Sequence, residues 1–302
     1  MDRLTGLQVF VLAVEEGSLT AAGRRLGLSA AMAGRHLREL ESQVKARLLQ
    51  RTTRSLALTD AGRRYYERCR RMLDEFEEAN REVSDHAETL RGHIRMAAPV
   101  TFGALQLAPV VARFMAAHPE VTVQVLLSDR YVNLLESDID LAIRIGELTQ
   151  QGLIVRRIGQ TRMLACAAPG YLARHGTPGS PEALSEHPRL TFSDAVSASD
   201  WTFTGADGRA HSIRGAGLLA ADNMQFLLAA ALAELGVVFG PDFVLGEHVA
   251  RGELVALLPD HATAQLPIHA VLPTARHIPR RVRALLDLVA EQLAGSSQFP
   301  SQ

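Results

Sequence analysis

The chain has 302 residues, of which 47% are hydrophobic, and a formal net charge of −1. This length allows two ordinary domains with sizeable cores, and the apolar fraction is that of an ordinary soluble protein. The charge is unevenly distributed, because residues 1–71 hold fourteen Lys and Arg against seven Asp and Glu. This segment is therefore at +7 and the remainder at −8, which is typical of a nucleic-acid-binding module joined to a mildly acidic body.

The two cysteines, Cys69 and Cys166, lie far apart in the sequence. Their spacing indicates neither a zinc site nor a disulfide framework, so we expect buried apolar residues in a protein of the reducing cytoplasm. The N-terminus lacks the order of basic, apolar and small-residue segments found in secretion signals. No apolar run is expected to reach membrane-spanning length, and we predict no membrane association.

The first fifty residues predict three short helices. Residues 4–16 carry an apolar stripe at helical spacing, and Gly17 is placed to end that helix. Ser18 and Ser29 can each cap a following helix with the side-chain hydroxyl. Gly27 can end the helix between them in a left-handed conformation, which Gly adopts without steric cost.

The second and third helices have the outline of a helix-turn-helix, in which the third helix enters the DNA major groove. The Thr-rich segment 50–59 then predicts a short β-ribbon, or wing, whose arginines can reach phosphates or a minor groove. The alternative interpretation is a basic, solvated helical hairpin. The residues that we expect to contact DNA are Ser29, Ala30, Ala31, Arg35, His36, Arg38, Arg51, Thr52, Thr53 and Arg54.

A long helix follows, which Thr59 can cap. Its apolar residues recur at three- and four-residue steps, the spacing of a heptad seam, and Asn80 is a polar member that can set the register. A pattern over more than three heptads predicts a homo-oligomer formed through the 66–90 helix, whereas the alternative is an amphipathic helix packed on its own domain. Arg91 and Gly92 break the pattern and mark a domain boundary. The seam residues are Tyr66, Cys69, Leu73, Phe76, Asn80, Val83, Ala87 and Leu90.

After Gly92, strands alternate with helices, which predicts an open α/β sheet with parallel strands and ligands at the carboxyl ends of the strands. A hairpin is expected around Ala206-Asp207-Gly208. The predicted strands are 93–98, 121–127, 139–145, 163–168, 237–239 and 266–272, and the predicted helices are 102–117, 131–136, 223–235 and 279–293, with a helical turn at 169–172 and another helix opened by Pro241.

Thr101 is the expected first residue of an effector site. We expect it at the N-terminus of helix 102–117, where its hydroxyl and free backbone N–H groups suit an anion; the alternative is a plain N-cap. Asn223 is expected to cap the helix 223–235. The sequence contains no phosphate loop, H-E-x-x-H or G-x-S-x-G motif, so we predict no catalytic residue, metal ligand or cofactor.

Two sets of fragments resemble LysR-type transcriptional regulators. RRLGLS, RHLRELE and ARLLQRTTRSLALTDAG are similar to the DNA-binding part of that family, and APVTFGALQLAPVVARF, DLAIRIGEL, LAELGVVFGPDF and RRVRALLDLV to its effector domain. The resemblance implies a winged helix-turn-helix over 1–58, a linker and dimerisation helix over 59–92, and a two-lobed effector domain like periplasmic binding proteins over 93–295. It places lobe I at about 93–162 and 267–295, lobe II at about 163–266, and a disordered tail at 296–302.

The sequence departs from the family pattern in the turn that faces the DNA groove. Ala30, Ala31 and Gly34 stand where many members carry Gln, Ser and Ser, which leaves fewer donors for base readout. Gly23 stands where Ala is usual, and it can allow close helix packing. The resemblance also implies which residues contact a bound effector: Thr101, Phe102, Ser128, Gly146, Asn223 and Phe239.

The expected function is a sequence-specific, DNA-binding transcriptional regulator that works as a dimer or tetramer. A small molecule, with an anion as the candidate, would control it from between two α/β lobes. One alternative is an architectural DNA-binding protein without an effector, since the groove-facing residues are poor in donors. The other is a hydrolase or transferase that uses the space between the lobes, for which the sequence offers no catalytic constellation.

Overall fold

The computed structural model describes residues 2–51, 56–83, 89–130, 139–148, 153–194, 197–198, 200–215, 217–273 and 278–295. The chain divides into two compact units, Met1–Thr89 and Leu90–Gln302. The first has one hydrophobic core, and the second has two large cores with a small one beside them.

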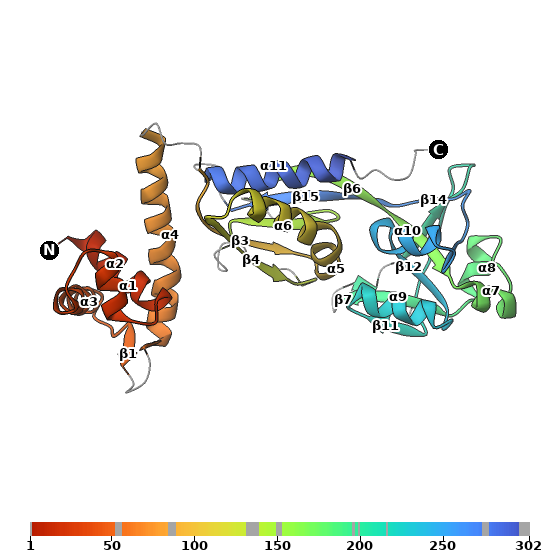
Figure 1. Cartoon of the computed structure of the whole chain (residues 1–302). Helices are drawn as coiled ribbons and strands as arrows, with labels where there is room; N and C mark the ends of the chain where they lie inside the picture. The colour runs from red at the N-terminus through yellow and green to blue at the C-terminus, as the bar shows by residue number, and fades with distance from the viewer. Residues whose placement is uncertain are drawn as a thin grey trace. The chain divides into compact units, whose positions relative to one another are not determined.

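The first unit is a helix-turn-helix with a β-ribbon and a long helix (Figure 1). Ser18 and Ser29 cap α2 and α3 as predicted, since their hydroxyls accept from Ala21 N at 3.3 Å and Met32 N at 3.2 Å. Gly27 is left-handed, with φ of +68°. The elements are α1 (Arg3–Glu15), α2 (Leu19–Arg25), α3 (Ala30–Val44), β1 (Leu49–Arg51), β2 (Leu56–Leu58) and α4 (Asp60–Val83).

Close approaches hold these elements together. A Cβ at Gly23 would lie 3.2 Å from Ala33 Cβ, so this glycine does permit close packing of α2 on α3. Thr59 caps α4, as predicted, by accepting from Gly62 N at 2.9 Å. A Cβ at Gly62 would lie 1.9 Å from Leu48 O, so only Gly fits where α4 starts against the backbone of Leu48, the residue before β1.

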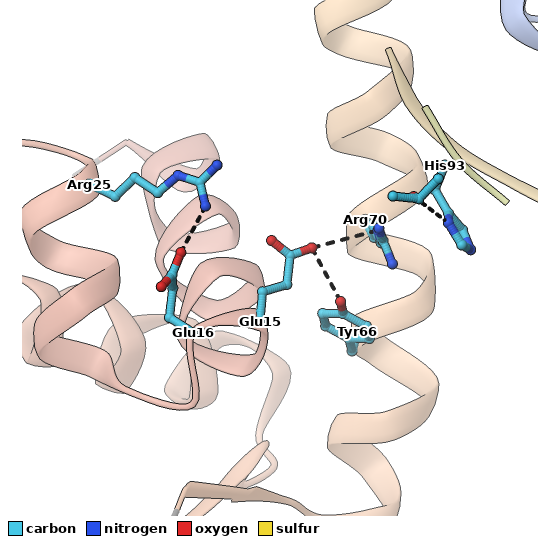
Figure 2. Close-up of polar contacts among 7 residues, drawn as sticks. Glu15, Glu16, Arg25, Tyr66, Arg70 and His93 are labelled. Carbon is cyan, nitrogen blue, oxygen red and sulfur yellow. Dashed lines mark hydrogen bonds and ion pairs between the residues drawn. The ribbon is translucent and has the colours of Figure 1, made fainter. Parts of the chain in front are cut away.

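The first turns of α4 complete the core of their own unit. Phe10 of α1 is fully buried, with its ring centroid 5.9 Å from that of Tyr65 and 6.3 Å from that of Tyr66. Glu15 of α1 accepts from the Tyr66 hydroxyl at 3.3 Å and pairs with Arg70 at 3.6 Å (Figure 2). Cys69 is also buried in this core. Helix α4 therefore covers the apolar face of α1 with its first turns.

The predicted seam is wrong for this part of α4. Tyr66, Cys69 and Leu73 pack on their own unit, as the alternative interpretation had it, because they lie on the face that covers α1. The predicted seam residue Phe76 is 47% exposed, and so is Met72, at 58%, which is not part of the predicted seam. Ala87 falls outside the described residues, and so does the side chain of Val83.

The second unit consists of two α/β lobes joined by crossing strands. Lobe I contains β3 (Gly92–Ala98), α5 (Val100–Phe102), the π-helical turn η1 (Gly103–Leu107), α6 (Ala108–Ala117), β4 (Val121–Leu127), β5 (Leu141–Ile145) and α11 (Arg280–Gly295). Lobe II contains α7 (Pro169–His175), α8 (Pro181–Ser185), β7 (Arg189–Asp194), β8 (Ser197–Ala198), β9 (Trp201–Thr204), β10 (Ala210–Ile213), β11 (Leu219–Ala221), α9 (Met224–Leu232), β12 (Val237–Pro241), α10 (Asp242–Ala250), β13 (Val255–Ala256) and β14 (Ala262–Thr263). The crossing strands are β6 (Ile154–Ala167) and β15 (Gln265–Leu272).

The main sheet has the strand order β4-β3-β5-β15-β6-β12-β7-β11. Strands β3, β4 and β5 are parallel to one another, and β7 is parallel to β11 and β12, as predicted. Strands β6 and β15 are antiparallel to their neighbours, so the sheet is mixed. The reason is that β6 leads the chain from lobe I into lobe II and β15 brings it back (Figure 1).

Each lobe buries its own apolar side chains. In lobe I, α6 and α11 pack together on one face of the sheet (Figure 1). The helix Val100–Ala117 is long and apolar enough to cross a membrane, contrary to the expectation from sequence. Its buried residues Phe102, Leu107, Val110 and Phe114 belong to the lobe I core, which accounts for that apolar character.

In lobe II, β9 and β10 form the predicted hairpin. The predicted helix 131–136 lies outside the described residues.

Both cysteines are buried free thiols, as expected. Burial raises the pKa of Cys69 to about 11 and that of Cys166 to about 12. Both are therefore protonated at neutral pH, which makes them poor nucleophiles.

Candidate DNA-binding surface and effector site

Helix α3 has one buried and one exposed face. Ala33, Leu37 and Leu40 are buried against α1 and α2, so the residues between them at helical spacing point to solvent. The predicted DNA contacts on the exposed face are Ser29, Ala30, Ala31, Arg35 and Arg38.

His36 does not belong to this exposed face. It is only 7% exposed, and its carbonyl oxygen lies 3.7 Å from the Cβ position of Gly6 in α1. Because α1 and α3 approach so closely here, the imidazole is placed on the inner side of α3. The prediction of a DNA contact at His36 is corrected accordingly.

The wing is described at its base. Strands β1 and β2 are antiparallel, with Leu49 opposite Leu58 and Arg51 opposite Leu56. The predicted contacts Thr52, Thr53 and Arg54 lie outside the described residues, as does the side chain of Arg51.

Three residues of the candidate effector site meet at one edge of the lobe I sheet. Thr101 follows β3, Ser128 follows β4 and Gly146 follows β5, and the carboxyl ends of parallel strands lie at the same edge. Ser128 N donates to Ala98 O at 3.0 Å, and Gly146 N donates to Pro267 O at 2.9 Å. Gly146 is left-handed, with φ of +96°, and open space surrounds its Cβ position.

Thr101 is not the N-cap that the sequence predicts. Helix α5 begins one residue earlier, at Val100, and the Asp129 carboxylate accepts from Val100 N at 3.0 Å. The Thr101 side chain is only 5% exposed, and its Oγ1 has no hydrogen-bond partner in the described part of the chain. A buried hydroxyl without a partner is uncommon in native proteins and requires an explanation.

Asp129 is a residue of this site that the sequence analysis missed. Burial raises its pKa; the Val100 N–H opposes this effect, and the charge of Asp222 adds to it. A carboxylate thus already occupies the helix N-terminus, where a free anion would bind. The position of Asp129 directly after a predicted strand, near the expected start of a helix, was the available signal.

The other implied effector contacts divide into one polar residue and two core residues. Asn223 caps α9 as predicted, since Oδ1 accepts from Phe226 N at 3.0 Å. Phe102 is fully buried, and Phe239 packs between Trp201 and Phe203 at centroid distances of 5.2 and 5.5 Å. Their side chains fill the cores of the two lobes, so the implied contacts are corrected for both.

No three His, Cys, Asp or Glu side chains are grouped as a metal site requires within the ranges that the structure describes. Comparison with known proteins then assigns the family. The profile of bacterial regulatory helix-turn-helix proteins of the lysR family matches residues 4–63, and that of the LysR substrate binding domain matches residues 87–294. The chain belongs to the LysR family of transcriptional regulators.

Full-length relatives agree with this assignment. An HTH-type transcriptional regulator of Haemophilus influenzae is 34% identical over 285 residues, covering 94% of this chain and 99% of the relative. The regulator CrgA of Neisseria meningitidis is 32% identical, covering 96% and 97%. The structure of CrgA matches with a TM-score of 0.63, covering 95% of this chain and 98% of that one. Full-length AphB of Vibrio cholerae matches at 28% identity with a TM-score of 0.61, covering 96% and 99%.

These findings confirm the predicted fold and class. The protein is a LysR-type regulator with an N-terminal helix-turn-helix and a two-lobed substrate-binding domain.

Proposed function

We propose that this LysR-type regulator is a cytoplasmic protein without enzymatic activity that binds double-stranded DNA in a sequence-specific way. Helix α3 would lie in the major groove. The single observation that supports this most directly is the exposed face of α3, which carries Arg35 and Arg38 opposite the buried face of Ala33, Leu37 and Leu40. Ala30 and Ala31 offer no side-chain donors, so the two arginines would supply the base contacts and the wing residues Arg51, Thr52, Thr53 and Arg54 the backbone contacts.

A small-molecule effector would bind between the lobes, at Thr101, Ser128, Gly146 and Asn223. The unpartnered Thr101 hydroxyl supports this site, because a ligand that supplies the missing hydrogen bond would remove the cost of leaving the group unsatisfied. An anionic ligand group would compete with the Asp129 carboxylate, which already accepts from Val100 N at the start of α5. That carboxylate favours a ligand that carries a hydrogen-bond donor.

The protein would form homo-oligomers through α4, with a dimer as the unit. Met72 and Phe76 are exposed on this helix, while exposed arginines such as Arg64 and Arg68 precede them and the exposed Glu75 and Glu77 accompany them. Antiparallel pairing with a second copy would place the arginines of one helix beside the glutamates of the other.

Footprinting on the promoter region next to the protein's own gene tests the DNA-binding proposal. A regulator protects a discrete site, and an Arg38→Ala variant loses that protection. The architectural alternative, which the donor-poor Ala30 and Ala31 favour, predicts uniform weak protection across the fragment. A thermal-shift screen of small acids and aromatic metabolites tests the effector proposal, since a ligand at about 100 times its Kd adds about 2.7 kcal/mol of stability.

A further inference from the structure

Phe243 contributes to both large hydrophobic cores of the effector domain. It is the second residue of α10 in lobe II and is half-buried. Its ring packs against the lobe II core, which includes Val244 and Leu245, and also against the lobe I core. Among the residues that the structure describes, Phe243 alone packs against both.

The lobe I partner of Phe243 is Phe102. The two ring centroids are 5.3 Å apart and the rings are inclined at 87°, an edge-to-face arrangement that aromatic pairs favour. Phe102 directly follows Thr101. Phe102 is fully buried in the lobe I core among side chains such as Leu107 and Val110. Phe102 therefore has little room to follow a moving partner without displacing the Thr101 segment.

The helix that begins at Val100 also contains a wide turn. The π-helical turn η1 starts at Gly103, immediately after Phe102. Such turns interrupt the regular hydrogen-bond ladder and are frequent at functional sites. The Thr101–Phe102 segment thus directly precedes the irregular turn of its helix.

A second contact ties the start of α10 to the crossing strands. The Thr161 hydroxyl of β6 donates to Asp242 Oδ1 at 2.6 Å. Thr161 is buried and pairs with Leu266 of β15, at the place where the chain crosses between the lobes in both directions. Asp242 and Phe243 together join α10 to the crossing strands and to the lobe I core.

We propose that Phe243 is a positioning residue that couples lobe II to the Thr101 segment. A shift of one lobe against the other changes the Phe102–Phe243 contact, and with it the backbone that carries Thr101. The reverse also holds, because a coupling free energy is reciprocal. The link to effector sensing rests on the proposed function, whereas the mechanical coupling between the lobes does not.

Hydrogen exchange by mass spectrometry on the full-length protein, without any ligand, tests this coupling. Phe243→Ala is expected to raise amide exchange both in α10 and in lobe I over residues 100–114. The matched control is Leu245→Ala, which empties a fully buried position in the same helix but belongs to the lobe II core alone. It is expected to raise exchange in lobe II only. Phe243→Leu keeps most of the apolar volume but loses the edge-to-face ring contact, so it should raise exchange in lobe I less than Phe243→Ala does.

Two outcomes would overturn the proposal. One is increased exchange confined to lobe II in Phe243→Ala, and the other is an equal effect of Leu245→Ala on lobe I. If Phe243→Ala fails to fold, a double-mutant cycle of Phe102→Leu and Phe243→Leu replaces it. The expected coupling between the two substitutions is about tenfold in the equilibrium constant for local opening of lobe I, which hydrogen exchange reports and which is equivalent to about 1.4 kcal/mol. Strictly additive effects of the two substitutions on that equilibrium would refute the coupling. A ligand that binds independently of Thr101 would refute the effector site and leave the coupling intact.

Discussion

Replacing Thr101 with Val tests the buried hydroxyl directly. A Thr acting as an N-cap would lose about 1 kcal/mol on this change, because the cap hydrogen bond disappears. In this structure Asp129 accepts from Val100 N instead, and Thr101 Oγ1 is buried without a partner among the described residues. Val keeps the shape and removes an unsatisfied group that costs about 1–3 kcal/mol. We therefore expect Thr101→Val to stabilise the ligand-free protein by about 1 kcal/mol, raising Tm by about 2–4 °C.

Thr191→Val is the matched control. Thr191 is also buried, but its hydroxyl donates to Leu219 O at 3.2 Å, so the same change breaks a hydrogen bond that is made. We expect it to destabilise the protein by about 1 kcal/mol. Both variants are compared with the parent by calorimetry and by urea unfolding, since the midpoint then reports stability if the slope is unchanged.

The two variants should move in opposite directions. If Thr101→Val is destabilising to the same extent as Thr191→Val, the Thr101 hydroxyl has a partner in solution and the argument for an effector site at this position fails. If the Thr101→Val variant is more stable than the parent but binds a ligand from the thermal-shift screen as tightly, the Thr101 hydroxyl is an unsatisfied buried group that has no role in binding.

Three further predictions concern DNA, assembly and pH. Arg54→Ala should weaken binding similarly for all sequences and reduce the salt dependence by about one counterion; an unchanged salt slope in a titration would remove Arg54 from the phosphate contacts. Phe76→Asp should give monomers that bind DNA poorly, because it places a charge in an apolar contact; light scattering that still shows the parent oligomer would contradict the α4 interface. Burial raises the pKa of Asp129, so the folded state keeps the carboxyl proton to higher pH than the unfolded chain does. The free energy of unfolding should therefore fall as pH rises from the ordinary Asp range to that raised value. Asp129→Asn should flatten this slope in urea unfolding at a series of pH values, and an unchanged profile would refute the assignment.

Several features of this protein follow from local sequence alone. Ser18, Ser29, Thr59 and Asn223 cap helices as predicted, because a cap depends on a side chain and a backbone N–H two or three residues away. The alternation of strands and helices likewise indicates the α/β class, since each element is specified by its own periodicity. The family resemblance in short motifs then adds the domain plan.

Other features depend on which elements meet in space. Periodicity identifies the apolar face of α4 but not the element that packs against it. In the structure Tyr66 and Cys69 pack in the core around Phe10, whereas Phe76 is exposed. His36 lies next to the apolar stripe of α3, and only the close approach of α1 decides that it is buried.

The candidate site shows the same division. The residues around Thr101 predict an N-cap at that position. In the structure Asp129, 28 residues later in the chain, accepts from Val100 N, the N–H group just before Thr101. The contact between Phe102 and Phe243 is further still from any local pattern. The sequence by itself determined most of the helices, the caps at Ser18, Ser29, Thr59 and Asn223, and the family, because those depend on residues within a turn or two. Only the tertiary structure decided which faces are covered and which polar groups lack a partner, because both depend on contacts between segments distant in the chain.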